Sequence, residues 1–413
     1  MKIAVPSLPV ARTEGVRIYL DDGRALIDGI ASWWTACHGY NHPHIRAAVA
    51  RQLETMPHVM FGGLTHEPAR RLAARLAGLL PSDLNHVFFS DAGSVAVEVA
   101  MKMALQFWLN RGERGRTKFL AFNGGYHGDT LGTMAVCDPG EGMHSLFTGL
   151  LPPQPMLDLP RDGASLAAFE PFLDAHAGEL AGIIVEPLVQ GAGGMIFHEP
   201  EVLGRLRHAA DRHGLILIFD EIFTGFGRTG TLWASEQFDL KPDIMTMGKG
   251  MGGGFPLSAV ASSFKRMSAK PFGEPSGSSS SYGGNPLAAA AGLGAVEIIL
   301  EEKLVENSAR VGALMLDGLK ELQEKYRFIG DVRGRGLMIG VEMVADRTTK
   351  EPLDKTITRA LFHEALERGL ITMSYSQVIR INPPLVISED EAMCGIDILD
   401  ESFAAIARRF GLD

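Results

Sequence analysis

The spacing of apolar residues divides the chain into an amino-terminal hairpin, a central alternation of strands and helices, and a carboxyl-terminal part. Residues 15–32 alternate apolar and polar side chains around an Asp-Gly pair at positions 22 and 23, which predicts a β-hairpin. Residues 44–56 and 67–80 repeat apolar side chains at helical spacing, which predicts two amphipathic helices.

From about residue 85, short apolar segments alternate with helical stretches. These segments lack polar alternation, so we expect strands that are buried on both faces. That pattern is typical of a mostly parallel sheet flanked by helices, and the predicted fold class is α/β. The predicted strands are residues 86–90, 118–122, 182–186, 215–220, 244–247 and 258–262.

The last hundred residues predict a smaller α+β domain. A helix over 287–302 leads out of the central region, and helices over 304–326, 357–368 and 389–410 alternate with strands within 329–344 and 378–381. We expect a large ligand-binding domain over 46–304 and a small domain over 305–413. The amino-terminal segment, residues 1–45, is expected to pack with the small domain.

Composition narrows the function classes. Hydrophobic residues make up 46% and charged residues 21% of the 413 residues, as in ordinary globular proteins. The net charge of −10 with no basic run argues against nucleic acids and anionic membranes as partners and favours small molecules. Three widely separated cysteines, no apolar run of about 20 residues and no signal-like start predict a cytoplasmic protein.

Two charged residues follow predicted strands in a way that favours chemistry. Asp220 ends an apolar strand, which places a carboxylate at the sheet edge where α/β proteins bind ligands, although such a residue also often caps a turn. Lys249 follows another strand and is flanked by glycines in MGKGMGGG, where a partly buried lysine can act as a nucleophile. The segment is not a phosphate-binding Walker loop, because the required glycine and hydroxyl residue are missing.

Two further strand ends add polar and aromatic groups. Gly93, Ser94 and Val95 form a small-residue turn between a strand and a predicted helix over 97–107, where free backbone N–H groups at the helix start can bind a phosphate. Tyr126 lies on a glycine-flanked loop and can stack on a flat ring. A phosphate cradle, a stacking aromatic, a strand-end aspartate and a glycine-flanked lysine are together the groups that pyridoxal phosphate requires.

Two other patterns point elsewhere. Residues 225–230 match G-x-G-x-x-G, which leaves an NAD-dependent oxidoreductase as an alternative, but two acidic residues precede the match and no good helix follows it. Three histidines between residues 38 and 44 suggest metal ligands, yet the proline and aromatic residues among them favour a pocket wall. We predict no metal site.

Over essentially its whole length, the sequence resembles the class III, or ω-type, aminotransferases of fold type I. The resemblance implies that Asp220 pairs with the pyridine nitrogen of pyridoxal phosphate, that Ile222 packs under the ring and that Lys249 forms the Schiff base. It also assigns the phosphate to the segment 93–95 and ring stacking to Tyr126.

The same resemblance assigns two more residues to the cofactor. Glu186 would line the cofactor side, and Ser281 would reach the phosphate bound by the neighbouring subunit. The role of Ser281 implies a homodimer with shared active sites.

Within this family, the first 150 residues look most like the 7,8-diaminopelargonic acid aminotransferases of biotin synthesis. The similar stretches include SWWTACHGYNHP, GGYHGDT and VCDPGEGMHSLF. That branch transfers the amino group of S-adenosylmethionine to 8-amino-7-oxononanoate. The carboxyl-terminal part differs, because the arginine-bearing Arg-Pro-Phe-Gly of the branch is replaced by Met-Ser-Tyr-Ser at 373–376.

Arg380 instead matches the arginine of general ω-aminotransferases, and Ala192 stands where other members have a glutamate that masks it. We therefore hypothesise amino transfer between an ω-amine or ω-amino acid and a 2-oxo acid, pyruvate or 2-oxoglutarate, by a ping-pong mechanism. Trp33, Trp34, Arg380 and Arg228 are the expected substrate-binding residues. The S-adenosylmethionine reaction, an aminomutase or decarboxylase, a binding protein without catalysis and, more remotely, the oxidoreductase remain as alternatives.

Overall fold

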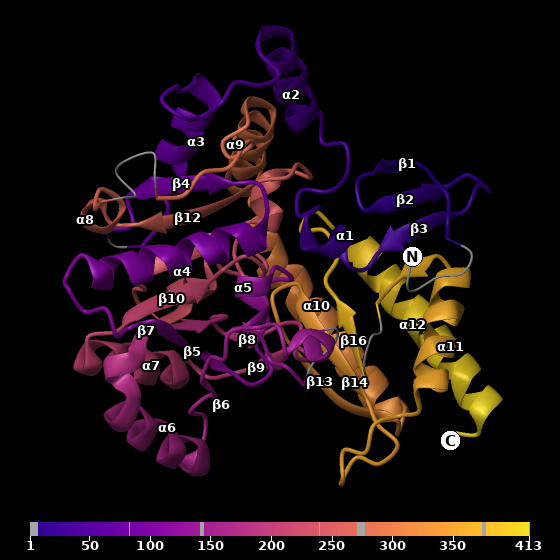
Figure 1. Ribbon diagram of the computed structural model, residues 1–413. Coiled ribbons are helices and arrows are strands. Elements are labelled where there is room, and N and C mark those ends of the chain that lie inside the picture. The colour runs from indigo at the N-terminus through magenta and orange to yellow at the C-terminus, as the bar shows by residue number, and fades with distance from the viewer. Residues whose placement is uncertain are drawn as a thin grey trace. The chain divides into compact units, whose positions relative to one another are not determined.

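The computed structural model describes residues 7–81, 83–140, 144–238, 240–270, 277–373 and 377–412. The chain divides into two compact units (Figure 1). The large unit comprises Ala47–Gly225 and Trp233–Glu297, and the small unit comprises Met1–Arg46, Phe226–Leu232 and Ile298–Asp413. The segment Phe226–Leu232, which lies inside the range expected for the large domain, thus belongs to the small unit.

The large unit is built on a seven-stranded sheet with the order β4-β12-β11-β10-β7-β5-β6. The strands β11, β10, β7, β5 and β6 run parallel, whereas β12 is antiparallel to both of its neighbours. The predicted mostly parallel α/β sheet is therefore confirmed. The strands are β4 (His86–Ser90), β5 (Lys118–Phe122), β6 (Met156–Leu157), β7 (Leu180–Val185), β10 (Ile216–Asp220), β11 (Ile244–Met247) and β12 (Ser258–Ser262).

Helices cover both faces of this sheet, which explains why its strands lack polar alternation. Phe119 and Ala121 of β5 pack on the face covered by α4 (Gly93–Leu109), which runs across the sheet in Figure 1. Leu120 and Phe122 point to the other face, where they pack with α6 (Gly163–His176) and α7 (Pro200–His213).

Shorter elements complete the large unit and its borders. They are α2 (Pro43–Thr55), α3 (Glu67–Ala77), α5 (Leu131–Met134), α8 (Phe264–Met267), α9 (Pro286–Glu301), β8 (Val189–Gln190), β9 (Ile196–Phe197) and the 3-10 helices η1 (His144–Phe147), η2 (Ala177–Glu179), η3 (Ala234–Phe238) and η4 (Lys249–Gly252).

The described residues of the small unit form a mixed four-stranded sheet, an antiparallel three-stranded sheet and three helices of 13 to 22 residues. The amino-terminal hairpin joins the carboxyl-terminal part of the chain, because Ile27 of β3 pairs in parallel with Leu370 of β15. The elements are β1 (Val10–Glu14), β2 (Arg17–Leu20), β3 (Ala25–Asp28), α1 (Ala31–Trp34), α10 (Leu304–Lys325), β13 (Ile329–Arg335), β14 (Met338–Met343), α11 (Lys355–Glu367), β15 (Leu370–Ile371), β16 (Val378–Ile381) and α12 (Glu389–Phe410).

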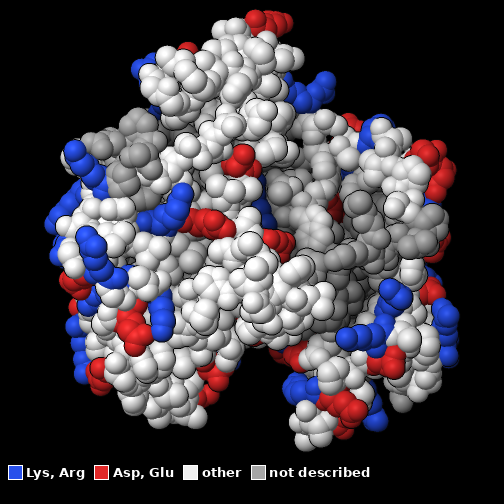
Figure 2. All heavy atoms as spheres, in the orientation of Figure 1, with Lys and Arg blue, Asp and Glu red and all other residues white. Residues whose placement is uncertain are grey.

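Two surface properties complete the description. None of the helices among the described residues is long and apolar enough to cross a membrane. Lysine and arginine are interspersed with aspartate and glutamate on the face drawn in Figure 2. The described residues of that face therefore form no continuous basic surface of the kind that follows a phosphate backbone.

Candidate active site

The centre of the candidate site is a buried carboxylate at the carboxyl end of β10. Asp220 is 4% exposed. One of its oxygens accepts a hydrogen bond from Nδ1 of His127 at 2.7 Å. The other oxygen accepts from the Thr246 hydroxyl at 3.1 Å and from the backbone N–H of Ile222 at 3.1 Å. Three hydrogen-bond donors therefore fix the orientation of the carboxylate.

A second buried carboxylate lies behind the first. Glu186 follows β7, and its two oxygens accept hydrogen bonds from the backbone N–H groups of Tyr126 at 3.0 Å and Gly191 at 3.1 Å. Burial, against an opposing effect of His127 and with a smaller contribution from nearby Asp220, raises the pKa of Glu186 to about 7. Glu186 thereby ties the loop that carries Tyr126 to the end of the neighbouring strand.

The amino terminus of α4 lies beside these strand ends. Its N-cap residue, Ala92, provides no side-chain cap, so the first backbone N–H groups of the helix remain available to a ligand. The hydroxyl of Ser94 accepts a hydrogen bond from the backbone N–H of Asp129 at 3.1 Å. A Cβ atom at Gly128, whose φ is +134°, would lie 2.2 Å from the Ser94 hydroxyl, so only glycine fits there.

Lys249 follows β11 and approaches the same place. Its backbone has φ +46°, a left-handed conformation that a non-glycine residue adopts at an energetic cost. The side chain is half-buried, and its Nζ atom lies 5.2 Å from the centroid of the Phe223 ring. Cβ atoms built at Gly93 and Gly248 would lie 3.2 Å and 3.6 Å from the Ile222 side chain, so the helix start, Ile222 and the lysine loop converge.

Tyr126, on the loop that Glu186 holds, contacts two polar side chains, Asp129 and His144. Its hydroxyl donates to Asp129 at 3.0 Å, and its ring stacks on His144 with centroids 5.8 Å apart. His144 in turn contacts the other oxygen of Asp129 at 2.9 Å. Burial, and secondarily the neighbouring Asp129, raise the pKa of Tyr126.

The predicted substrate-binding residues lie in the small unit, where Asn382 contacts two of them. Trp34 donates its indole N–H to the Asn382 side chain at 2.7 Å, and Arg228 donates to the Asn382 backbone carbonyl at 3.3 Å. Arg380 lies two positions before Asn382 on β16 and is 4% exposed. Arg228 is also buried, and its Nε and Nη2 atoms have no hydrogen-bond partner among the residues that the structure describes.

Trp33 lies on a turn whose backbone is hydrogen-bonded to the buried carboxylate of Asp28. Residues 31–34 all have positive φ values, and both oxygens of Asp28 accept backbone N–H groups in this turn, from Ile30 and Ser32. The Tyr40 hydroxyl also donates to Asp28 at 2.5 Å. The Trp33 side chain is half exposed, at 50%. The sequence predicted a simple hairpin end here and missed this left-handed turn.

Arg380 pairs in an antiparallel bridge with Met373, where related sequences were expected to carry an arginine. Residues paired in this way have Cβ atoms about 4.5–5.5 Å apart on one face of the sheet. The other replaced positions, 374–376, lie outside the described residues.

The two competing patterns do not form the sites they suggested. The segment after Gly225 leads into turns and the 3-10 helix η3, so no helix amino terminus is present to bind a pyrophosphate. His38 is buried and contacts the Gly39 carbonyl, and burial lowers its pKa to about 4. Within the described ranges, no group of three or more histidine, cysteine, aspartate or glutamate residues could hold a metal ion.

Comparison with known proteins decides the family. The family model described as Aminotransferase class-III matches residues 2–403. The chain belongs to the class III aminotransferases. It is 44% identical to the adenosylmethionine-8-amino-7-oxononanoate aminotransferase of Mycobacterium leprae, with 93% of this chain and 89% of that protein covered. It is 40% identical to the protein of the same name from Corynebacterium glutamicum, with 92% and 90% covered.

Solved structures of this family have the same fold. A PLP-bound amine transaminase from an uncultivated Pseudomonas species superposes with a TM-score of 0.90 at 35% identity, covering 97% of this chain and 95% of that one. An (S)-enantioselective omega-transaminase from Thermomicrobium roseum superposes with a TM-score of 0.89 at 32% identity, covering 97% and 93%. The protein is therefore a transaminase that uses pyridoxal phosphate.

The large unit of this aminotransferase fits that cofactor. The uncapped start of α4 with Ser94 offers donors to a phosphate, Asp220 offers a buried carboxylate to a ring nitrogen, and Lys249 offers an amine. All predicted cofactor residues lie in this unit, although Ser281 is exposed and its expected contact with a neighbouring subunit stays a prediction. Sequence reasoning gave no role to His127, whose approach to Asp220, 93 positions away, no local pattern indicates.

Proposed function

We propose that this aminotransferase transfers the amino group of S-adenosylmethionine to 8-amino-7-oxononanoate. The observation that carries the proposal is the identity of 44% and 40%, over about nine-tenths of the chain, with two proteins named for that reaction. The comparisons support this activity better than the transfer from ω-amines to 2-oxo acids that the sequence led us to expect.

When bound, pyridoxal phosphate would supply the carrier for the amino group between the two substrates. Asp220 would hold the ring nitrogen of the cofactor, because three hydrogen-bond donors fix its buried carboxylate in place. Lys249 moves the substrate proton, since it is half-buried beside the strand ends and follows a flexible glycine.

Arg380 is suited to bind the carboxylate of 8-amino-7-oxononanoate. The branch that uses this substrate carries its arginine at the position of Met373, and Met373 is the bridge partner of Arg380. Because bridge partners project from one face of a sheet, an arginine at 380 can reach the space that an arginine at 373 would serve. The missing arginine therefore does not exclude the substrate.

Asp129 and Tyr126 are suited to the cationic donor. The Asp129 side chain is 54% exposed, and hydrogen bonds from Tyr126 and His144 orient it. A sulfonium ion carries a positive charge that a carboxylate and an aromatic face both attract.

Transfer between simple amines and 2-oxo acids is a second candidate. It is favoured by the 35% identity to a solved amine transaminase and by methionine, not arginine, at position 373. In that reaction Arg380 would bind the carboxylate of pyruvate or 2-oxoglutarate.

A homodimer is part of the proposal. Large apolar side chains of the large unit are exposed, and a second copy would cover them. They include Leu53, Met60, Phe61, Leu64, Leu146, Phe147, Leu150, Phe255 and Tyr282. Light scattering of the purified protein should give twice the mass of one chain, and a monomer would contradict this part.

The test of the function is a half-reaction measurement. Purified enzyme carrying its cofactor is mixed separately with S-adenosylmethionine, L-alanine, L-glutamate and simple diamines, and the visible absorbance of the cofactor is followed. We expect S-adenosylmethionine to bleach it and 8-amino-7-oxononanoate to restore it. Bleaching by alanine or amines, with S-adenosylmethionine inert, would establish the second candidate instead.

Arg380→Gln separates binding from chemistry. Loss of an ion pair to a substrate carboxylate should raise the KM for 8-amino-7-oxononanoate about 10- to 100-fold, with a smaller change in kcat. An unchanged KM would remove Arg380 from the proposal. Arg380→Lys keeps the charge but loses the paired N–H geometry. Its KM for 8-amino-7-oxononanoate should lie between those of the wild type and Arg380→Gln.

A further inference from the structure

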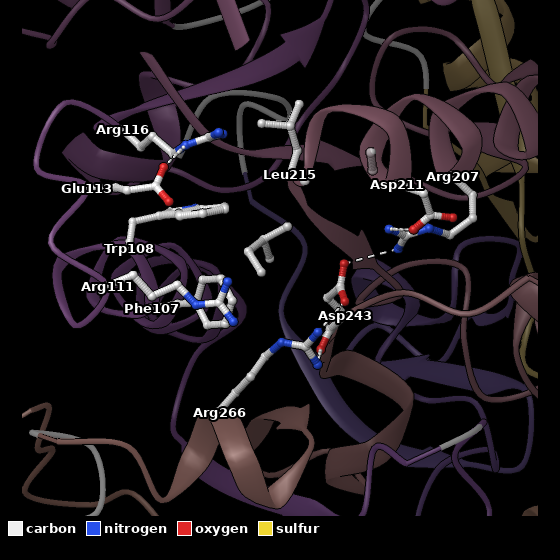
Figure 3. Close-up of a pocket in the computed structure, with 13 residues that line it drawn as sticks. Phe107, Trp108, Arg111, Glu113, Arg116, Arg207, Asp211, Leu215, Asp243 and Arg266 are labelled. Carbon is white, nitrogen blue, oxygen red and sulfur yellow. Dashed lines mark hydrogen bonds and ion pairs between the residues drawn. The ribbon is translucent and has the colours of Figure 1, made fainter. Parts of the chain in front are cut away.

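The large unit has a pocket at the edge of the sheet opposite to the strand ends that carry Asp220 and Lys249. It has a volume of about 400 Å³. Leu215 and Asp243, which precede β10 and β11, line it together with residues at the end of α4, on α7 and on α8 (Figure 3). Because β10 and β11 are parallel and carry Asp220 and Lys249 at or just beyond their far ends, this pocket is separate from the cofactor site.

Arginines outnumber carboxylates in this pocket. Its charged residues are Arg111, Arg116, Arg207 and Arg266 against Glu113, Asp211 and Asp243. Its formal net charge is therefore positive, in a chain whose net charge is −10.

Each of the three carboxylates forms an ion pair with an arginine other than Arg111. Glu113 pairs with Arg116 at 2.7 Å. Asp243 pairs with Arg207 at 3.0 Å and with Arg266, and it is fixed further by the backbone N–H of Leu217. Arg207 also pairs with Asp211 at 2.5 Å.

Among the described residues, Arg111 has no carboxylate partner at the pocket. Its guanidinium lies 4.2 Å from the Phe107 ring centroid and 6.0 Å from that of Trp108, and it forms no ion pair with any residue described. In Figure 3, Arg111 and Arg116 lie on one side of the opening, with Arg266 and Arg207 around Asp243 on the other. The buried Nε atoms of Arg207 and Arg266 also lack acceptors among the described residues.

We propose that this pocket binds a phosphate group, either as the free ion or as a phosphate monoester. Guanidinium groups on more than one side suit a tetrahedral dianion, which accepts hydrogen bonds in several directions, better than a planar carboxylate. The rings of Phe107 and Trp108 contact the Arg111 guanidinium and restrict the side chain. Less side-chain conformational entropy is therefore lost when a ligand binds. The proposal does not depend on which amines the enzyme uses.

The experiment is isothermal titration of the enzyme loaded with pyridoxal phosphate, so that the cofactor's own phosphate site is filled. Inorganic phosphate, glycerol 3-phosphate and succinate are titrated at constant ionic strength. The variant is Arg111→Gln, and its control is Arg114→Gln, an exposed arginine three positions on that does not line the pocket.

We expect saturable binding of a phosphate, with a Kd about ten-fold or more higher in Arg111→Gln and unchanged in Arg114→Gln. Tighter binding of glycerol 3-phosphate would identify an organic phosphate as the ligand, and tighter binding of the inorganic ion would identify free phosphate. Absence of binding, equal Kd values for wild type and Arg111→Gln, or succinate binding as tightly as phosphate would overturn the proposal.

Discussion

His127 should be a positioning residue for the reaction, and its removal should lower activity without unfolding the protein. Its Nδ1 atom lies 2.7 Å from Asp220, and the two side chains are 1% and 5% exposed. When both partners are buried in this way, a hydrogen bond to a charged group contributes about 1.5–3 kcal/mol of stabilisation. In His127→Leu, Asp220 would keep only the donors from Thr246 and the Ile222 backbone.

If the loss of this hydrogen bond raises the activation free energy by that amount, kcat/KM of His127→Leu should fall about 10- to 100-fold. Pyridoxal phosphate should also dissociate more readily, because the carboxylate that meets its ring nitrogen is less well fixed. The assay measures steady-state kinetics together with the cofactor Kd from visible absorbance. His127→Asn is the matched control, since its amide N–H can take the place of Nδ1–H and should restore most of the activity.

A thermal melt of each variant separates this role from a loss of folding. Equal kcat/KM and cofactor Kd in wild type and His127→Leu would refute the reasoning, and so would equally large losses in His127→Asn and His127→Leu at unchanged Tm.

Three further predictions concern chemistry, pH and packing. Lys249→Ala should abolish turnover and the visible absorbance of the cofactor bound through its lysine, as measured on the purified variant. Since the pKa of Glu186 is about 7 in the folded protein against an ordinary value of 4.5, the free energy of unfolding should fall as pH rises from about 4.5 to about 7, by up to about 3 kcal/mol. Urea unfolding of Glu186→Gln should lack this fall, and an identical pH dependence would contradict it. Gly312→Ala should lower Tm although alanine favours helices, because its Cβ would lie 2.1 Å from the Gly336 carbonyl oxygen. The control Gly204→Ala, with no atom within 4 Å, should leave Tm unchanged or raise it.

The central strands were predictable because both of their faces are buried, which removes polar residues from them. The segments predicted at 86–90, 118–122, 244–247 and 258–262 coincide with β4, β5, β11 and β12. The start of α4 was less predictable, since the apolar repeat begins only at Val97 whereas the helix begins at Gly93. Gly93 lies close to the Ile222 side chain, a tertiary contact that local spacing does not encode.

The sequence by itself determined which chemical groups follow which strands: the aspartate of β10, the glycine-flanked lysine of β11 and the small residues before α4. Parallel strands bring their carboxyl ends to one edge, so the order along the chain was enough to predict a common cofactor site. Only the tertiary structure decided what holds these groups. The contacts of Asp220 with His127 and of Arg380 with Met373 depend on the pairing of strands and the path of loops, which local spacing does not encode. The arginine-lined pocket has the same origin, because its charged residues come from the loop after α4, from α7, from α8 and from the residue before β11, which are far apart in the sequence.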